Sequence, residues 1–573
     1  MRQLLLLPVL FIFSNSQPPG LPAFPNGFIS KAAETSNRTV DVNIRTGNVS
    51  AVIRGLQFSY GRSFRGIPYA RAPVGNLRFA YAQRKDPTGT VNASAFGAAC
   101  TQKPMKVQIP GAGGSFSEDC LFINVFTPLN ATQTSKLPVY MFFHYGGFEG
   151  GSGNLDEGIF PNLVNRAPLV MVSMNYRVGP FGFYTTRDSN APGNFATSDW
   201  IEALHWVHRY ISFFGGDPAR ITIGGQSAGA ESVSAITMTP LSKSLFKQAI
   251  LESGSSFDAS IMSYSERTRN TSEYLSIALN CSTLAQWSDR SFSNLLSCMR
   301  NASSAQIMVA DASLPSHRSK WSLVRDDKYF PETLEVLALK RNKSINILAG
   351  NVNTEWIFFE DRSYMTTNVN SSRNTGSQLQ RDLAASYEMS YYQSQAAVQN
   401  AADMAYITAN NWTDSRHVDW EAKRLQLWSE MVFIGPVLRD ASFFRSNGNT
   451  VFLYSLDWLS PAALPDVTER KLRGVQHGSE MQYLFETSSQ MYNCTAGDNL
   501  LREYFSIAWT NFIKSGHPTP SGSSLPFRWL PMDASNRFLS FSPTPTMKSD
   551  YHKSAYFWTC TAPRIDGYNG PFC

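Results

Sequence analysis

A single serine flanked by glycines is the pattern in this chain best suited to nucleophilic chemistry. The sequence Gly-Gln-Ser-Ala-Gly, with Ser227 at its centre, occurs once, between a short apolar segment (221–223) and a predicted helix (230–238). A serine in such a strand-to-helix turn is presented for attack, and a glycine two residues away on either side lets neighbouring backbone pass without a clash. By itself, the pattern is equally compatible with a glycine-rich turn that holds an incidental serine.

A pair of glycines upstream favours the catalytic interpretation. Gly146 and Gly147 follow the continuous apolar segment 139–144. Glycines at the end of a strand can present bare backbone N–H groups to a substrate oxygen. Together with the N–H of Ala228 they would form an oxyanion hole, where the loss of one donor typically costs about 10²- to 10³-fold in rate. The sequence therefore predicts an acyl-transfer site at Ser227.

Strand-like and helix-like segments alternate around these motifs. Buried-strand patterns occupy residues 139–144, 169–176, 221–223, 248–251, 345–348 and 451–454, and helical patterns occupy 197–211, 230–238 and 498–514. Continuous apolar runs are typical of strands covered on both faces, and the alternation predicts a mostly parallel sheet between layers of helices.

Further motifs give the chain a family resemblance. They are Phe-Arg-Gly-Ile-Pro-Tyr-Ala (64–70), Glu-Asp-Cys-Leu-Phe-Ile-Asn-Val (118–125), Asn-Tyr-Arg (175–177) and Phe-Gly-Gly-Asp-Pro (214–218). With these motifs, the chain resembles the type-B carboxylesterases, which include cholinesterases, bile-salt lipases and fungal lipases, over nearly its whole mature length. The resemblance implies an α/β-hydrolase fold, with a large, mostly parallel central sheet flanked by helices, and a triad in the order serine, acid, histidine.

The resemblance also supplies the other two members of the triad. Glu355 ends a segment (350–355) similar to the family's acid motif, and His477 lies in a segment (474–480) similar to its histidine motif. In these roles His477 takes the proton of Ser227, and Glu355 fixes the tautomer of the imidazole and stabilises its charged form. Glu480, three residues after the histidine, is not expected to act as a second catalytic acid.

Three residues depart from the family pattern. Gln226 stands where many members, cholinesterases among them, have glutamate, so a negative charge beside the nucleophile is missing. Tyr145 replaces the first of three glycines in the oxyanion loop. Trp356 follows the acid where glycine is usual, and predicts a bulkier acid loop. None of the three substitutions removes a predicted catalytic group.

The expected activity is hydrolysis of carboxylic esters through an acyl-serine intermediate. Choline esters are disfavoured, because the loop between Cys100 and Cys120 holds no Trp, no Tyr and no acidic cluster before Glu118 that would attract a quaternary ammonium. The loop is also short for a lipase lid. We therefore favour soluble or moderately hydrophobic esters. The alternatives are a lipase or sterol esterase acting on long-chain lipid esters, and a catalytically silent, neuroligin-like binding protein, which would have no reason to keep the triad.

Composition restricts the other possibilities. The chain has 573 residues, of which 13% are aromatic and only 16% are charged. The aromatic content excludes a disordered chain. The net charge of +6 is spread along the sequence without a Lys/Arg cluster, which argues against a nucleic-acid partner. Because Ser227 and His477 must meet across 250 residues, we expect residues 17–573 to form a single catalytic domain.

The N-terminus predicts export. Residues 1–16 combine Arg2, a ten-residue apolar run and small residues before Gln17, which is typical of a signal peptide. The run is too short to span a bilayer of about 30 Å, and no later stretch is long and apolar enough. The protein is therefore expected to be secreted and extracellular, with no transmembrane segment; its oligomeric state is left open.

Cysteines and glycosylation sequons agree with an oxidising compartment. Neighbouring cysteines predict the disulfides Cys100–Cys120 and Cys281–Cys298, with the pairing of Cys494, Cys560 and Cys573 open. Sequons occur at Asn37, Asn48, Asn92, Asn130, Asn270, Asn280, Asn301, Asn342, Asn370, Asn411 and Asn493, and glycans there would supply the solubility that charge does not. Neither a cofactor nor a metal is expected, because His205 and His208 have no acidic or cysteine partner in the sequence.

Overall fold

The computed structural model describes residues 38–103, 115–155, 163, 167–258, 267–314, 320–341, 344–359, 375–386, 392–408, 420–461, 474–485 and 494–570. The predicted signal peptide lies outside these ranges.

Within the described residues, thirteen strands form one large sheet, ordered β1-β2-β3-β7-β9-β8-β10-β11-β12-β13-β14-β15 with β4 paired to β2. Its strands are β1 (Thr39–Thr46), β2 (Val49–Gln57), β3 (Arg62–Pro68), β4 (Gly89–Asn92), β7 (Phe122–Thr127), β8 (Leu137–Phe143), β9 (Val170–Met174), β10 (Gly216–Gln226), β11 (Gln248–Glu252), β12 (Asn346–Val352), β13 (Thr450–Leu456), β14 (Phe538–Phe541) and β15 (Thr546–Lys548).

The centre of this sheet is parallel. Every pairing from β9 through β8, β10, β11, β12 and β13 to β14 is parallel, whereas β1, β2, β3 and β7 on one side and β15 on the other join antiparallel. The prediction of a mostly parallel central sheet is confirmed. All six predicted strands are present, but β10 begins earlier than predicted, at Gly216, and its register against β8 shifts before Ile221.

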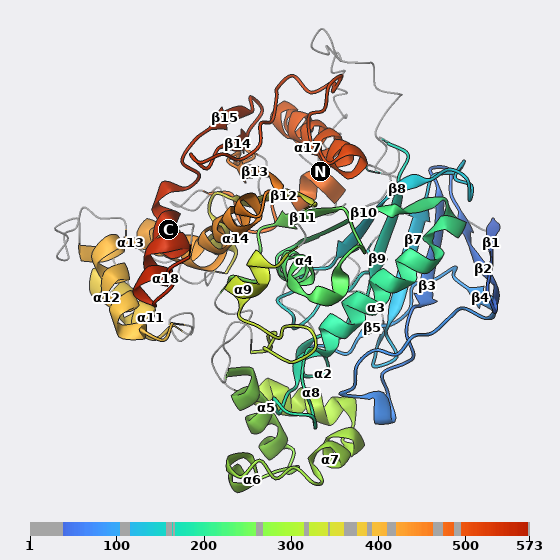
Figure 1. Ribbon diagram of the computed structural model, residues 1–573, viewed down its shortest axis with the longest axis horizontal. Helices are drawn as coiled ribbons and strands as arrows, with labels where there is room; N and C mark the ends of the chain where they lie inside the picture. Colours follow the sequence, from blue (N-terminus) through green and yellow to red (C-terminus); the bar gives the residue numbers. More distant parts are fainter. Residues whose placement is uncertain are drawn as a thin grey trace, which may run out of the picture.

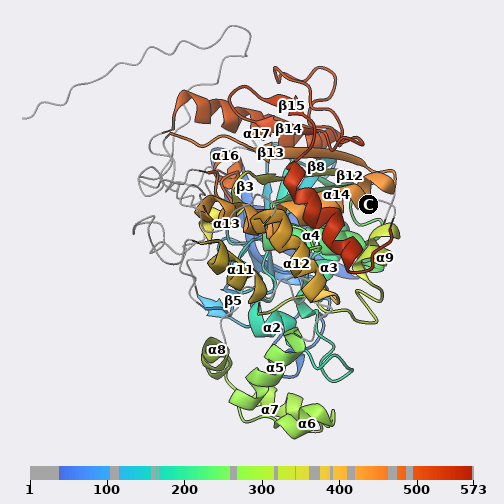
Figure 2. The ribbon, with the colours of Figure 1, turned by 90° about the vertical axis from the view of Figure 1, so that its left-hand side faces the viewer.

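The described residues form helices that cover both faces of the sheet and further helices that lie outside these layers. They are α2 (Gly179–Phe183), α3 (Phe195–Tyr210), α4 (Ala228–Met238), α5 (Arg267–Ala278), α6 (Leu284–Ser288), α7 (Leu295–Asn301), α8 (Ser304–Ser313), α9 (Leu334–Leu339), α11 (Gly376–Ala384), α12 (Gln395–Asp403), α13 (Trp420–Ser429), α14 (Gly435–Ser446), α16 (Met481–Phe485), α17 (Ala496–Ser515) and α18 (Ala562–Ile565). The three predicted helices correspond to α3, α4 and α17. Figure 2 shows α17 above the sheet and α3 and α4 below it.

The alternation of side chains along β8 explains this layering. Val139, Met141 and Phe143 belong to the core under α3 and α4, whereas Tyr140 and Phe142 belong to the core under α17. Successive side chains of a strand point to opposite faces, so a strand that is apolar at every position is stable only when both faces are covered. The continuous apolar run seen in the sequence is thus the signature of a strand in the middle layer.

Two groups of helices lie outside the layers. Helices α5 to α8 form a lobe at the lower edge of Figure 1, and α11, α12, α13 and α18 form another at the left. The first lobe contains the disulfide Cys281–Cys298, and the disulfide Cys100–Cys120 lies near the small sheet of β5 (Ala99–Cys100) and β6 (Phe116–Ser117). Both predicted pairings are confirmed. Cys560 is also disulfide-bonded, and Cys573 lies outside the described residues.

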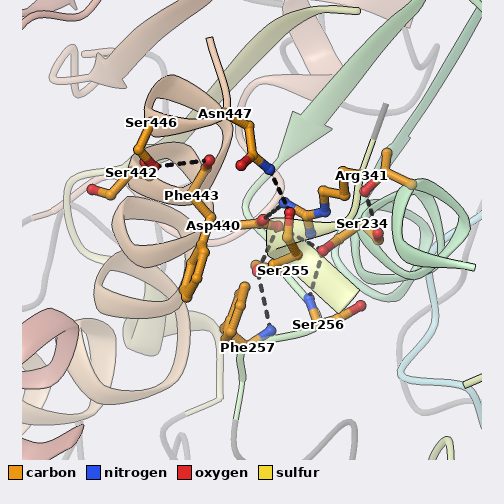
Figure 3. A network of polar contacts seen from close by, with 12 residues as sticks. Ser234, Ser255, Ser256, Phe257, Arg341, Asp440, Ser442, Phe443, Ser446 and Asn447 are labelled. Carbon is orange, nitrogen blue, oxygen red and sulfur yellow. Dashed lines mark hydrogen bonds and ion pairs between the residues drawn. The ribbon is translucent and has the colours of Figure 1, made fainter. Parts of the chain in front are cut away.

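A polar network fixes α4 against α14 and the loop after β11. The carboxylate of Asp440, on α14, accepts hydrogen bonds from Ser234 of α4 at 2.6 Å and from Ser255 at 2.9 Å, and forms an ion pair with the buried guanidinium of Arg341 (Figure 3). Hydrogen bonds to a charged group are stronger than those between neutral groups. The network therefore helps to hold in place the helix that begins directly after Ser227.

No helix in the described part of the chain is long and apolar enough to cross a lipid bilayer.

A buried ion pair joins α3 to the segment after β9. Asp199, on α3, is fully buried, and its carboxylate accepts hydrogen bonds from the Nε and Nη2 atoms of Arg177 at 2.9 and 2.7 Å and from the Arg177 backbone N–H at 3.0 Å. Replacement of one partner would leave a buried charge uncompensated, which typically costs about 3–5 kcal/mol.

We predict that Asp199→Ala lowers the free energy of unfolding by about 3–5 kcal/mol, measured by denaturant or thermal unfolding. The matched control is Asp41→Ala, which breaks the exposed Asp41–Arg54 pair between β1 and β2. Exposed pairs contribute about 0–1 kcal/mol, so the control should unfold almost as the parent protein does. Equal effects of the two substitutions would contradict the importance given to burial.

Candidate active site

Ser227 occupies a strained turn between β10 and α4. Its backbone angles are φ 56° and ψ −129°, a region that residues other than glycine rarely adopt. The turn is held because the Ser227 N–H donates to the carbonyl of Glu252 and the Ser227 carbonyl accepts from the N–H of Glu231, both at 2.9 Å. A Cβ atom at Gly229 would lie 2.1 Å from the carbonyl oxygen of Phe143, so only glycine fits there.

The three predicted oxyanion donors lie on the two segments that flank this turn. Gly146 and Gly147 follow β8 and have φ values of 123° and 62°, and Ala228 is the first residue of α4. A Cβ at Gly146 would lie 2.2 Å from the carbonyl oxygen of Gly150, whereas the corresponding space at Gly147 is open. Within the described ranges, the N–H groups of these three residues donate to no protein acceptor. They are thus available to a substrate oxygen, beside the positive end of the α4 dipole.

Glu355 and His477 are joined although 122 residues separate them. His477 Nδ1 lies 2.5 Å from Glu355 Oε2, and Glu355 is completely buried in the 3₁₀ turn Glu355–Phe358 after β12. The other carboxylate oxygen accepts from the side-chain amide of Asn351 at 3.0 Å and from the Val352 N–H at 3.1 Å. Because a carboxylate only accepts, the bond places the proton of neutral His477 on Nδ1, so that Nε2 presents its lone pair on the opposite side of the ring.

Two hydrogen bonds hold the histidine segment against the acid segment, one between backbone groups and one from the backbone to a side chain. The Thr354 N–H donates to the Val475 carbonyl at 3.1 Å, and the Val475 N–H donates to Asn353 Oδ1 at 3.1 Å. On its far side the imidazole meets the residue before the serine, because Gln226 Nε2 lies 3.1 Å from His477 Nε2. The structure therefore gathers the predicted acid and histidine beside the turn that holds Ser227.

Three phenylalanine rings form an aromatic wall around His477 that no sequence motif predicts. The ring centroids of Phe433, Phe359 and Phe358 lie 4.5, 5.3 and 6.1 Å from that of the imidazole. Phe358 and Phe359 remain 39% and 38% exposed, so this wall presents an apolar surface. Phe358 and Phe359 follow the acid closely in the sequence and could have been found there. Phe433 reaches the site only through tertiary packing.

Trp356, the unusual residue after the acid, supports this wall from behind. Its ring stacks on Trp428 with the centroids 5.3 Å apart, and it contacts Phe359 at 5.2 Å. The predicted bulk of the acid loop therefore lies against α13, and glycine at this position would remove the stacking contact.

Two further carboxyl groups lie behind the site. Glu252 ends β11, and its Oε1 accepts from Trp509 Nε1 at 2.6 Å; Glu480 accepts from the hydroxyl of Ser253 at 3.0 Å. Both side chains are fully buried. Burial raises the pKa of Glu252 from 4.5 to about 8, and burial together with the nearby Glu355 and Glu252 carboxylates raises the pKa of Glu480 well above its ordinary value. Burial thus favours the neutral form of both groups, and each holds its proton to a higher pH than an exposed glutamate does.

The remaining predicted positions are peripheral to this centre. Six of the sequon asparagines lie in the described residues, and all are exposed: Asn48, Asn92, Asn130, Asn270, Asn280 and Asn301. The other five lie outside these ranges. In the described part of the chain no three His, Cys, Asp or Glu side chains are grouped so that they could hold a metal ion. His144 lies nearer to the centre, two residues before Gly146; it is buried and stacks on Tyr176 with the ring centroids 4.0 Å apart.

The raised pKa of Glu252 makes stability depend on pH. A group that binds its proton more tightly in the folded state stabilises the protein fully below its unfolded pKa, about 4.5, and this contribution is lost as the pH rises to about 8. Over this range the contribution of Glu252 to the free energy of unfolding falls by up to about 1.4 kcal/mol per pH unit.

We expect Glu252→Gln to remove this contribution, so that the melting temperature of the variant falls less between pH 5 and 8 than that of the parent protein. Glu332→Gln, on the surface, is the control and should follow the parent curve. If Glu252→Gln and the parent lose stability in parallel over this range, Glu252 is not held as a neutral acid.

Comparison with known proteins identifies the family of the chain. The model of the carboxylesterase family matches residues 38–558. The chain is 29% identical to human carboxylesterase 5A over 524 residues, covering 88% of this chain and 85% of that protein. It is 27% identical to the medium-chain fatty acyl-CoA hydrolase precursor of Anas platyrhynchos over 86% of this chain and 87% of that one. It is 29% identical to acetylcholinesterase-1 of Trittame loki over 79% and 82%. The family match and the α/β-hydrolase architecture both extend over nearly the whole described chain. The chain therefore belongs to the carboxylesterase family of carboxylic ester hydrolases.

Proposed function

We propose that the protein is a secreted serine carboxylesterase with Ser227 as nucleophile, His477 as base and Glu355 as the carboxylate that orients the base. The observation that carries this proposal is the 2.5 Å bond between the buried Glu355 and His477, formed beside a serine whose strained backbone projects it from the start of α4. A binding protein would gain nothing from this arrangement, since burying a carboxylate costs free energy unless its partners compensate.

Acylation follows from the geometry. His477 Nε2 removes the proton of Ser227 as the Oγ atom attacks the ester carbonyl, and the charge that develops on the carbonyl oxygen is stabilised by the N–H groups of Gly146, Gly147 and Ala228. Protonated His477 then gives its proton to the leaving alcohol, and the acyl group remains on Ser227.

Deacylation repeats these steps with water as the nucleophile. His477 takes a proton from water, the hydroxide adds to the acyl carbon, and Ser227 leaves with the proton that His477 returns. Glu355 does not itself take up the proton in either half of the reaction. Its two further hydrogen bonds, from Asn351 and Val352, hold its side chain in place while the charge on the imidazole appears and disappears.

The substrate class proposed is a soluble or moderately hydrophobic ester. Phe358, Phe359 and Phe433 offer apolar surface beside the base, which favours an apolar acyl or alcohol group. Gln226 is uncharged and touches the base, so the position beside the nucleophile supplies no negative charge for a cationic alcohol. The relative named as a medium-chain fatty acyl-CoA hydrolase also supports an acyl chain of moderate length.

Secretion is supported by the confirmed disulfides and by the exposure of the six described sequons. Glycans on these asparagines would explain how a surface poor in charge stays in solution.

We predict that Ser227→Ala reduces kcat for p-nitrophenyl butyrate by about 10⁶-fold, as expected for loss of the nucleophile of a triad. Glu355→Gln should cost about 10⁴-fold, because it keeps the shape of the site but favours the wrong tautomer of His477. Thermal melting checks that both variants fold. If the parent protein and Ser227→Ala are equally inactive across a panel of esters, the enzyme proposal is wrong.

The substrate class has its own test. A dissolved butyrate ester should be hydrolysed at least tenfold faster, per enzyme molecule, than an emulsified long-chain triglyceride, because the site is proposed to act on single molecules in solution. The measurement is titration of the released acid across the solubility limit of each ester. A sharp rise in rate on emulsions would instead support the lipase alternative.

A further inference from the structure

The side chain of Gln226 contacts Nε2 of His477, the atom that must accept the proton of Ser227 in the proposed reaction. Gln226 is the last residue of β10, its side chain is almost wholly buried, and its carboxamide nitrogen lies 3.1 Å from His477 Nε2. Within the described residues, no hydrogen bond joins the imidazole to the hydroxyl of Ser227. The proposed base therefore rests against the neighbour of the nucleophile instead of against the nucleophile.

The carboxamide of Gln226 and the hydroxyl of Ser227 compete for the same atom, Nε2 of His477. Glu355 fixes the proton of neutral His477 on Nδ1, so Nε2 presents a single lone pair in the ring plane. The carboxamide N–H of Gln226 donates to that lone pair. Activation of Ser227 requires its O–H to donate to the same lone pair, and one in-plane lone pair serves one good hydrogen bond at a time.

After proton transfer the requirement is reversed. The imidazolium Nε2 carries a hydrogen and needs an acceptor, and the carboxamide group can supply one by turning its oxygen toward the ring. Glutamine can thus serve both protonation states. Glutamate at this position could only accept, with a full negative charge, and methionine, of similar length, could do neither.

The charges around the imidazole are few, which makes this contact measurable. Glu355 faces Nδ1, whereas Glu252 and Glu480 lie behind the site, where burial raises the pKa of both. The rings of Phe359, Phe433 and Phe358 cover other sides of His477. A new charge at position 226 would therefore act on the imidazole at short range in an apolar setting.

We propose that Gln226 is a positioning residue for the hydrolysis: its carboxamide holds His477 Nε2 in the resting enzyme and yields that place to Ser227 when the ester binds. This inference rests on the proposed function. It assigns two effects to Gln226. Its carboxamide forms a resting hydrogen bond that Ser227 must displace, and it places an uncharged group beside Nε2 where glutamate would place a negative charge.

The test compares the full-length parent protein with Gln226→Glu and Gln226→Met in the pH dependence of kcat/KM for p-nitrophenyl butyrate from pH 5 to 10. Gln226→Glu should move the midpoint of the acid limb upward by about one to three pH units, because a carboxylate at this distance stabilises the imidazolium. Gln226→Met should raise kcat/KM on the alkaline plateau by about fivefold, because the free energy of one neutral hydrogen bond corresponds to a factor of about that size. The midpoint of its acid limb should not move upward as that of Gln226→Glu does. Melting curves confirm that each variant is folded.

The inference is overturned if the acid limb of Gln226→Glu coincides with that of the parent, since a carboxylate touching Nε2 must move it. A plateau of Gln226→Met that equals or falls below that of the parent also overturns it, because the bond would then not compete with Ser227. Ser227→Ala separates this failure from that of the proposed function: if that variant is inactive while the Gln226 variants match the parent, only the role of Gln226 is wrong.

Discussion

The bond between Glu355 and His477 is the constraint on which the rest of the candidate site depends. It links a turn after β12 to the described segment directly before α16, and the acid is completely buried. A buried carboxylate is tolerated only where donors compensate for lost water, and Asn351, Val352 and His477 together supply them. These contacts fix both the place and the tautomer of the imidazole.

The sheet makes that bond possible by placing the ends of parallel strands along one edge. Gly146 and Gly147, the proposed oxyanion donors, follow β8; Ser227 follows β10, Glu252 ends β11 and Glu355 follows β12. Adjacent parallel strands bring these carboxyl ends together although the residues are far apart in the chain. The strain at Ser227 is compensated by the backbone bonds to Glu252 and Glu231 and by the attachment of α4 to α14 through Asp440.

Much of this arrangement could be predicted from the sequence, for identifiable reasons. The central strands are apolar at every position because both faces are covered, and the glycines around Ser227 are required by backbone contacts as short as 2.1 Å for an added Cβ. The antiparallel strands β1 and β2 are not predicted. Strand β1 is largely polar and exposed, and polar residues interrupt the apolar residues of β2, so neither strand has the continuous apolar run of the central strands. The approach of Phe433 to His477 and the neutrality of Glu252 depend on tertiary packing, which no local pattern encodes. Gln226 could be noticed as a substitution, but its contact with the base could not.

The claim that matters most is that Ser227 is the nucleophile activated by this network. It is tested most directly by treating the protein with an organophosphate ester and locating the adduct by peptide mass spectrometry. The account predicts one phosphoryl group per chain, attached to Ser227, and a much slower reaction when Glu355 is replaced by glutamine. A folded protein that takes up no label, or that carries it on another residue at the same rate, would contradict the account.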